Sequence, residues 1–380
     1  MDKPRVSVLM SVYNGEPFVG AALDSILSQT FTDFEFIIIN DGSTDATAAV
    51  LEHQAAQDER IKLVNLPQNI GLSRAHNLGL GLAEGEYLAL QDADDISLPA
   101  RLSTQAALLD AQPALGVVGA IPDLIDPQGV LLGREQQYGT TNKALQQQLL
   151  HDCCFCHGSL MLRRSLLKQV GPYAPELEPA DDYDLLLRLA EVAEVANIDA
   201  ALYQYRLHPG SISRQRQARQ IQGAGLALER AAFRRHGPQP PLSALTTAAT
   251  YDLRAAIIAH LASDPALAQA SLSRARALWP AILDQAEPLV RVLDDQTGGR
   301  TVVASLAISR AVFEGLLPAN PLLARMRQHW EAGRHMQEVF ATWGQRDFQY
   351  VRPHLWAGLA AEPHWLMNRG VLRYLLRALL

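Results

Sequence analysis

Three aspartates lie together in the sequence Asp92-Ala93-Asp94-Asp95, one residue after the apolar run 87–90, and no basic residue is adjacent to them. Negative charges this close repel one another, so the cluster favours a bound cation. Carboxylate oxygens are ligands that Mg²⁺ and Mn²⁺ prefer, and both ions also bind phosphate. The alternative is a solvated loop in which Asp95 or Ser97 caps the following helix.

A second acidic group, Asp181-Asp182 with Asp184, begins a predicted helix. A carboxylate held near an acceptor hydroxyl can take its proton, which would make this group a general base. The alternative is structural, since acidic residues stabilise the N-terminal end of a helix. His208 follows in the sequence RLHPGSIS, where it would ligate the same cation, contact a phosphate, or lie in a surface loop.

Strands and helices alternate along the first third of the chain and would position these groups. Short apolar runs predict buried strands at 5–12, 34–40, 61–67, 86–92 and 115–120. Helical spacing predicts helices at 17–29, 44–58, 72–84 and 99–112. This alternation is typical of a parallel sheet with right-handed crossovers, and it predicts an α/β nucleotide-binding architecture.

Polar side chains stand where the predicted strands end, which is where an open parallel sheet binds its ligands. Ser11 and Tyr13 end the first strand, Asp41 follows the second, and Arg74 lies in the turn after the third. Tyr13 can lie against a base, Asp41 can accept hydrogen bonds from a base edge or ribose, and Arg74 can approach a diphosphate. With Asp92, these residues predict a nucleotide site.

Six pieces of the sequence resemble the family 2 inverting nucleotide-sugar glycosyltransferases, which have a GT-A fold. In order they are SVLMSVYNGEPFVGAALDSILSQTF, FEFIIINDGSTDAT, LVNLPQNIGLSRAHNLGLGLAEGEYLALQDADDISLPARLSTQ, HGSLMLRRSLLKQVGPY, DDYDLLLRLA and YRLHPGSIS. The resemblance covers residues 4–213. It implies a Rossmann-like, mostly parallel sheet with flanking helices.

The resemblance also implies roles on the donor side. Tyr13, Asp41 and Arg74 fall where the family binds the nucleoside and diphosphate. Asp92 and Asp94 match the Asp-x-Asp pair, in which the first residue contacts ribose or sugar and the second holds Mn²⁺ or Mg²⁺.

On the acceptor side, the resemblance implies that Asp182 is the catalytic base, and Asp181 stands where the family usually has Glu. His208 matches a late histidine near the diphosphate and metal. His157 and Gly158 match the segment before the acceptor side. The implied reaction is a single displacement that inverts the anomeric carbon.

Composition limits the function classes. The chain has 380 residues, 48% of them apolar, and a formal charge of −7 from 33 basic and 40 acidic residues, which argues against a protein that coats nucleic acid. Its three cysteines, Cys153, Cys154 and Cys156, form no disulfide framework and lack zinc-site spacing. We expect half-buried thiols on a strand, in a reducing compartment. No apolar run approaches the roughly 18–20 residues of a membrane helix.

The sequence predicts two domains, a catalytic domain at 1–214 and an all-α domain at 215–380 of unknown role. The second is rich in Ala, Leu, Arg and Gln and interrupted by prolines. Its last stretch, VLRYLLRALL, is an apolar helix face with two arginines, which would pack as a terminal helix or lie on a membrane surface or partner. We therefore expect a cytoplasmic protein, with peripheral contact at the inner membrane face or oligomer contact through this domain as the alternatives.

The sequence as a whole predicts a metal-dependent transferase that moves a sugar from a nucleoside-diphosphate sugar, with UDP favoured, to a hydroxyl of a glycan or lipid-linked acceptor in surface polysaccharide or glycolipid synthesis. One alternative is a sugar-phosphate nucleotidylyltransferase, but the residues after the first strand are YNGEPFV rather than a Gly-rich basic phosphate loop. The other alternative is a non-catalytic scaffold on a transferase fold.

Overall fold

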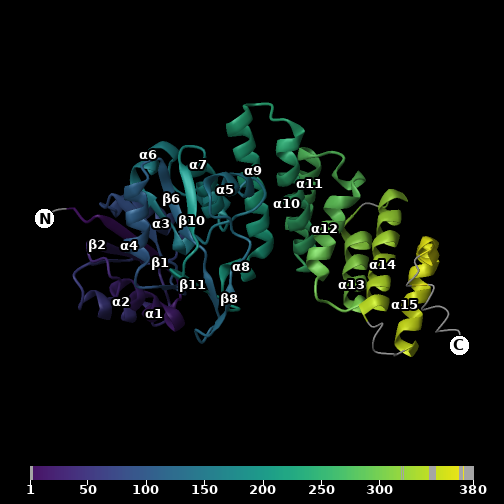
Figure 1. Ribbon diagram of the computed structural model, residues 1–380, viewed down its shortest axis with the longest axis horizontal. Coiled ribbons are helices and arrows are strands. Elements are labelled where there is room, and N and C mark those ends of the chain that lie inside the picture. The colour runs from purple at the N-terminus through teal and green to yellow at the C-terminus, as the bar shows by residue number, and fades with distance from the viewer. Residues whose placement is uncertain (1–2, 318, 320, 342–347, 368–370, 372–380) are drawn as a thin grey trace. The chain divides into compact units, whose positions relative to one another are not determined.

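The computed structural model describes residues 3–317, 319, 321–341, 348–367 and 371 (Figure 1). The chain forms two compact units, Met1–Thr247 and Ala248–Leu380. Helix α9 (Gln217–His236) belongs to the first unit because it packs on α7 (Asp181–Ala190), so this unit extends past residue 214. The division into a catalytic domain at 1–214 and a further domain at 215–380 stays a prediction.

The first unit is built on a seven-stranded sheet with the strand order β10-β6-β9-β4-β1-β2-β3. Its strands are β1 (Val6–Val12), β2 (Phe34–Asn40), β3 (Ile61–Asn65), β4 (Tyr87–Leu90), β6 (Leu115–Ala120), β9 (Met161–Arg163) and β10 (Glu194–Ile198). Only β9 runs antiparallel to its neighbours, β4 and β6. The predicted mostly parallel sheet is therefore confirmed, and every residue of β1 and β2 is buried, as a two-sided sheet requires.

Helices cover both faces of this sheet (Figure 1). The other helices of the unit are α1 (Glu16–Leu27), α2 (Thr47–Ala55), α3 (Leu72–Leu82), α4 (Arg101–Ala111), α5 (Asn142–Gln148), α6 (Leu167–Val170) and α8 (Ile212–Gln215). On one face, Val8 and Met10 of β1 form a core cluster with Leu23 of α1 and Leu102 of α4. On the other face α3 packs on β1 and β2.

A second sheet of four strands, in the order β5-β11-β7-β8, lies in the same unit. Its strands are β5 (Ile96–Ser97), β7 (Asp123–Ile125), β8 (Leu131–Arg134) and β11 (Tyr203–Arg206). The strands β7 and β8, which the sequence did not predict, form an antiparallel hairpin. It escapes sequence analysis because β7 has three residues and Leu131 and Leu132 of β8 are exposed, so neither strand has the alternation of a half-buried strand.

The cysteine segment also differs from expectation. Cys153, Cys154 and Cys156 lie in irregular backbone before β9, not on a strand. Cys154 and Cys156 are buried, and Cys153 is partly buried. Strand pairing begins only at Met161, because the backbone first forms a short turn at His157–Ser159.

The second unit is helical, as predicted. Its helices are α10 (Leu242–Leu261, which begins in the first unit), α11 (Pro265–Leu278), α12 (Ala286–Thr297), α13 (Val302–Arg310), α14 (Pro321–Ala341) and α15 (Phe348–Ala361). Apolar side chains such as Leu253, Leu293 and Trp330 form its core. In the part of the chain that the structure describes, no helix has the length and apolar character to cross a bilayer. The stretch VLRYLLRALL lies outside the described residues, except Val371.

Candidate active site

The aspartate loop that follows β4 is held in place by β11. The backbone N–H of Asp92 donates to the hydroxyl of Tyr203 at 3.3 Å. Arg206 donates from its backbone N–H to Asp95 at 2.8 Å and from Nε to the carbonyl of Asp94 at 2.7 Å. Because β11 comes more than a hundred residues later in the chain, the shape of this loop depends on tertiary packing.

A buried arginine lies beneath the same loop. Arg101 of α4 is fully buried and donates to the carbonyls of Leu90 at 2.6 Å and Leu160 at 3.1 Å. Its guanidinium stands 5.0 Å from the ring centre of Tyr203. Arg101 thus ties the end of β4 to the start of β9 and places a positive charge near Asp92.

The predicted metal ligands Asp94 and His208 are direct neighbours, with 2.9 Å between Oδ2 and Nε2. Burial raises the pKa of Asp94, and the charge of Asp92 raises it further, so the site has excess negative charge that a cation would relieve. The ring of Phe18 packs 4.8 Å from His208 and fixes its orientation.

A carboxylate and an imidazole suit Mn²⁺ or Mg²⁺ when phosphate and water supply the remaining ligands. Across the described ranges, no group of three or more His, Cys, Asp or Glu side chains is arranged to hold a metal by itself. The residues therefore fit a cation that is shared between the protein and a bound diphosphate.

Two histidines whose pKa values are shifted in opposite directions lie beside Asp92. His157 places Nδ1 3.2 Å from the Asp92 carboxylate and Nε2 2.9 Å from the hydroxyl of Tyr173. Burial opposes its protonation, but the charge and hydrogen bond of Asp92 prevail and raise the pKa of His157 to about 9. His76 stacks on Tyr173, and burial lowers its pKa to about 3. The site therefore holds one cationic and one neutral imidazole at neutral pH.

The predicted base lies at the same site. Burial raises the pKa of Asp182, the positive charge of His157 lowers it, and the charge of Asp92 raises it. Its neighbour Asp181 is buried and accepts a hydrogen bond of 2.6 Å from the Ser73 hydroxyl. Burial and the charge of Asp182 raise the pKa of Asp181 to about 6. The acids at residues 92 and 182, far apart in sequence, therefore share one electrostatic environment.

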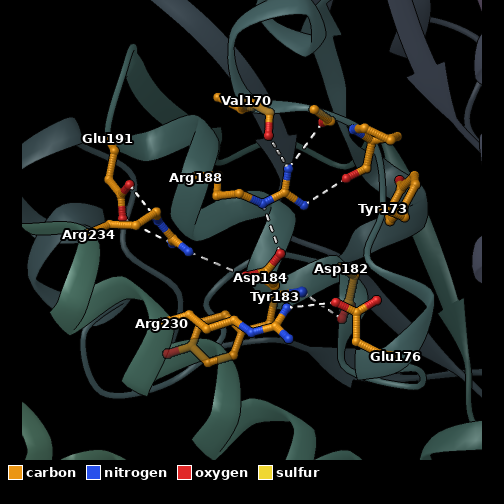
Figure 2. Close-up of polar contacts among 12 residues, drawn as sticks. Val170, Tyr173, Glu176, Asp182, Tyr183, Asp184, Arg188, Glu191, Arg230 and Arg234 are labelled. Carbon is orange, nitrogen blue, oxygen red and sulfur yellow. Dashed lines mark hydrogen bonds and ion pairs between the residues drawn. The ribbon is translucent and has the colours of Figure 1, made fainter.

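Helix α7, which carries both acids, is anchored along its length (Figure 2). Arg188 donates to Asp184 at 2.8 Å and to the carbonyl of Val170 at 2.6 Å. Arg234 of α9 pairs with Glu191 at 2.8 Å and with Asp184 at 3.6 Å. Asp184, grouped in the sequence with the two acids, therefore has a structural role, and its ion pairs keep the N-terminal turn of α7 in position.

On the donor side, Asp41 organises the loop before α3. Its buried carboxylate accepts backbone N–H bonds from Ile70 at 2.8 Å and Gly71 at 3.0 Å. Arg74 is exposed one turn further and donates to the carbonyl of Ile70 at 3.2 Å. Burial raises the pKa of Asp41. Both oxygens of Asp41 thus already have a partner, and a nucleotide would use their remaining lone pairs.

The other predicted donor residues end β1. Tyr13 is 49% exposed, which leaves its ring accessible to a base. The Ser11 hydroxyl is buried and has no hydrogen-bond partner in the described part of the chain. A Cβ atom at Gly15 would lie 3.8 Å from Ala93, so the end of β1 adjoins the aspartate loop.

Sequence reasoning missed several residues that shape this site. Arg101, Tyr173, Tyr203, Arg206 and Glu178 are the clearest cases, and Glu178 accepts the backbone N–H of Ser73 at 3.1 Å. The one available signal was Arg101, a charged residue on the apolar face of the helix predicted at 99–112. The others act through contacts between elements far apart in the chain, which no local pattern reveals.

Two solved structures have a similar fold. S. aureus TarS in complex with UDP-GlcNAc has a TM-score of 0.54 at 17% identity, covering 87% of this chain and 92% of that one. The mannosyltransferase PcManGT from Pyrobaculum calidifontis, in complex with GDP-Man and Mn²⁺, has a TM-score of 0.52 at 20% identity, covering 83% and 89%. The architecture is therefore that of a GT-A glycosyltransferase.

Comparison of the sequences identifies the protein family, which the shared fold alone does not. Residues 7–171 match the family described as Glycosyl transferase family 2. The O-antigen biosynthesis glycosyltransferase WbnJ of Escherichia coli is 35% identical over 208 residues, which are 53% of this chain and 80% of WbnJ. The chain belongs to glycosyltransferase family 2.

Proposed function

We propose that this glycosyltransferase is a metal-dependent, inverting enzyme that moves a sugar from a nucleoside-diphosphate sugar to a hydroxyl acceptor. The observation that carries the proposal is the shared environment of Asp182, His157 and Asp92. A base and a donor-side acid that influence one another's pKa can act on the two sides of a single anomeric carbon.

Asp182 supplies the base. Its pKa lies above that of an ordinary aspartate because of burial, which makes the ionised carboxylate a stronger proton acceptor. It takes the proton of the acceptor hydroxyl as that oxygen attacks the anomeric carbon, while the bond to the diphosphate breaks on the opposite face. Help of this kind accelerates reactions by about 10²–10⁴-fold.

His157 acts on the ionisation and orientation of Asp92 and Asp182, and Asp181 acts on the position of the helix turn that carries Asp182. The cationic His157 fixes the Asp92 carboxylate by a hydrogen bond and favours the ionised form of Asp182. Asp181, held by Ser73, replaces the family's usual Glu and has a shorter side chain. In this enzyme we assign Asp181 to positioning the N-terminal turn of α7 rather than to proton transfer.

Asp94 and His208 would hold Mn²⁺ or Mg²⁺, which supplies charge neutralisation of the departing diphosphate. UDP-sugars are the favoured donors, and the UDP-GlcNAc and GDP-Man found with the two structural neighbours define the donors to test first. The relation to an O-antigen enzyme supports a place in surface polysaccharide synthesis. Cytoplasmic location stays a prediction, with peripheral contact at the inner membrane face as its alternative.

The test is a donor screen. The full chain is mixed with UDP-GlcNAc, GDP-Man and other nucleotide sugars, each with Mn²⁺ or with EDTA. Thermal stabilisation and release of nucleoside diphosphate are then measured. We expect one donor class to raise the melting temperature only with Mn²⁺ and to be slowly hydrolysed. If no donor does either, the enzyme assignment fails and the non-catalytic scaffold is favoured.

A further inference from the structure

A groove of about 600 Å³ lies in the first unit, outside the donor side of the site. Its lining comes from the segment 137–154 between β8 and the turn before β9. The lining includes Gln137, Tyr138, Gln147, Leu150, Asp152 and Cys153. None of the roles assigned above uses this groove.

The groove adjoins the proposed base. Burial raises the pKa of the Cys153 thiol well above its usual value, and the nearby charge of Asp182 raises it further. Tyr183, the residue after Asp182, donates its hydroxyl to the carbonyl of Leu149 at 2.7 Å. The segment that carries the groove's lining residues is therefore in direct contact with the N-terminal turn of α7, and an acceptor bound in the groove would lie near the carboxylate that must deprotonate it.

One wall of the groove is preorganised. Gln148 donates to the carbonyl of Gln137 at 2.8 Å and accepts from the N–H of Gly139 at 2.8 Å, so both ends of its amide are engaged. Gln147, the preceding residue on α5, is exposed. The amide of Gln148 holds the 137–139 segment, and the exposed amide of Gln147 is accessible to a ligand.

The chemistry of the lining selects the kind of ligand. Amide and carboxylate groups form hydrogen bonds with hydroxyls, and the ring of Tyr138 and the exposed side chain of Leu150 offer apolar surface to the C–H face of a sugar. Among the described residues that line the groove, His151 is the one basic side chain, and there is no Lys or Arg whose permanent charge would bind a diphosphate. The groove therefore suits an uncharged saccharide better than a lipid diphosphate.

We propose that this groove binds the saccharide portion of the acceptor, beside Asp182. The inference rests on the proposed function and adds to it the chemical class of the acceptor.

The test compares two substitutions on α5. Gln147→Trp fills the groove from its exposed wall, and Lys143→Trp places the same side chain one turn away, at an exposed residue that does not line the groove. Each full-length protein is assayed with Mn²⁺ and the donor found above. Donor hydrolysis is measured without acceptor, and transfer is measured to para-nitrophenyl glycosides of glucose, galactose, N-acetylglucosamine, N-acetylgalactosamine and rhamnose.

We expect Gln147→Trp to lower kcat/KM for glycoside transfer by tenfold or more, mainly through KM, with unchanged donor hydrolysis. Lys143→Trp should change neither. Equal transfer by both variants would overturn the groove assignment while the proposed function stands. Donor hydrolysis without transfer to any glycoside would overturn the saccharide class. Absence of hydrolysis in the unsubstituted protein would instead contradict the proposed function, on which the inference rests.

Discussion

A Cβ atom at Gly158 would lie 2.7 Å from Oδ2 of Asp92 and would also collide with the hydroxyl of Tyr203. Contacts this short do not occur for real Cβ atoms, so any side chain at residue 158 must displace the aspartate, the tyrosine or the backbone turn. Gly158 was expected on the acceptor side from sequence. The structure shows it packed against the first acid of the Asp-x-Asp pair.

Gly158→Ala should therefore lower transfer at least tenfold with little loss of secondary structure, since the displaced groups are Asp92 and Tyr203. The matched control is Gly20→Ala in α1, where a Cβ atom meets nothing within 4 Å. This control should keep full activity and gain up to about 1 kcal/mol from helix propensity. Nucleoside diphosphate release and melting temperature measure both effects, and equal activity of the two variants would contradict the packing argument.

Asp182→Asn should reduce transfer by about 10²–10⁴-fold, because an amide cannot accept the acceptor's proton. The nucleotide contacts assigned above do not involve Asp182, so donor affinity should stay nearly unchanged. Calorimetric titration with UDP-GlcNAc or GDP-Man measures affinity, and a transfer assay measures the rate. Full activity in this variant would rule out Asp182 as the base.

Asp94→Ala should abolish the effect of Mn²⁺ on nucleotide binding, since only the His208 side of the ligand pair remains. In the unsubstituted protein, Mn²⁺ should tighten UDP or GDP binding by about tenfold or more, or about 1.4 kcal/mol. Asp199→Ala is the control, because Asp199 is an exposed acid paired with Arg134 at 3.4 Å. If Asp94→Ala keeps the full Mn²⁺ response, the cation is held elsewhere.

His76 should make the first unit less stable in mild acid. Its pKa is about 3 when folded and near 6.5 when unfolded, so between these values the unfolded state binds the extra proton. The free energy of unfolding should therefore fall as pH drops through 6.5, by up to about 1.4 kcal/mol per pH unit. His157 contributes in the opposite sense, since its raised pKa of about 9 gives stability below pH 6.5 that is lost as pH rises through 9.

His76→Phe separates this contribution from the others, because a phenyl ring can keep the stack on Tyr173 without titrating. Between pH 7 and pH 5 the stability of the variant relative to the unsubstituted protein should rise by about 2 kcal/mol. Denaturation followed by circular dichroism is the suitable measurement, since all five tryptophans lie beyond residue 247 and would report on the second unit. A constant difference across this range would contradict the assignment.

Long buried strands made the main sheet predictable. The runs at β1, β2 and β4 are apolar on both faces, and their order with helices leaves few topologies open. Because the carboxyl ends of parallel strands meet at one edge of such a sheet, the sequence could place Asp41 and Asp92 at the same edge, and their role in binding a ligand stays a prediction. The hairpin β7–β8 could not be predicted, because its strands are short and its tip is exposed.

The residues that contact the site residues could not be predicted from the sequence either. The family resemblance implied that His208 lies near the metal site of Asp94, but the orientation of that histidine depends on Phe18 of α1. Likewise, the cationic state of His157 follows from Asp92 across 65 residues of sequence. Residue types and their spacing indicate which residues are candidates for the site. The protonation state and orientation of their side chains depend on neighbours that are brought close only by folding.

Arg206 connects the aspartate loop to the β7–β8 hairpin. Besides the carbonyl of Asp94, its guanidinium donates to the carbonyls of Asp126 at 3.2 Å and Pro127 at 3.1 Å. Every one of these acceptors is a main-chain oxygen, so the connection is indifferent to which side chains the hairpin carries. Side-chain substitutions in that hairpin can therefore leave this connection intact, whereas shortening or lengthening it near residues 126 and 127 would displace the backbone of the aspartate loop.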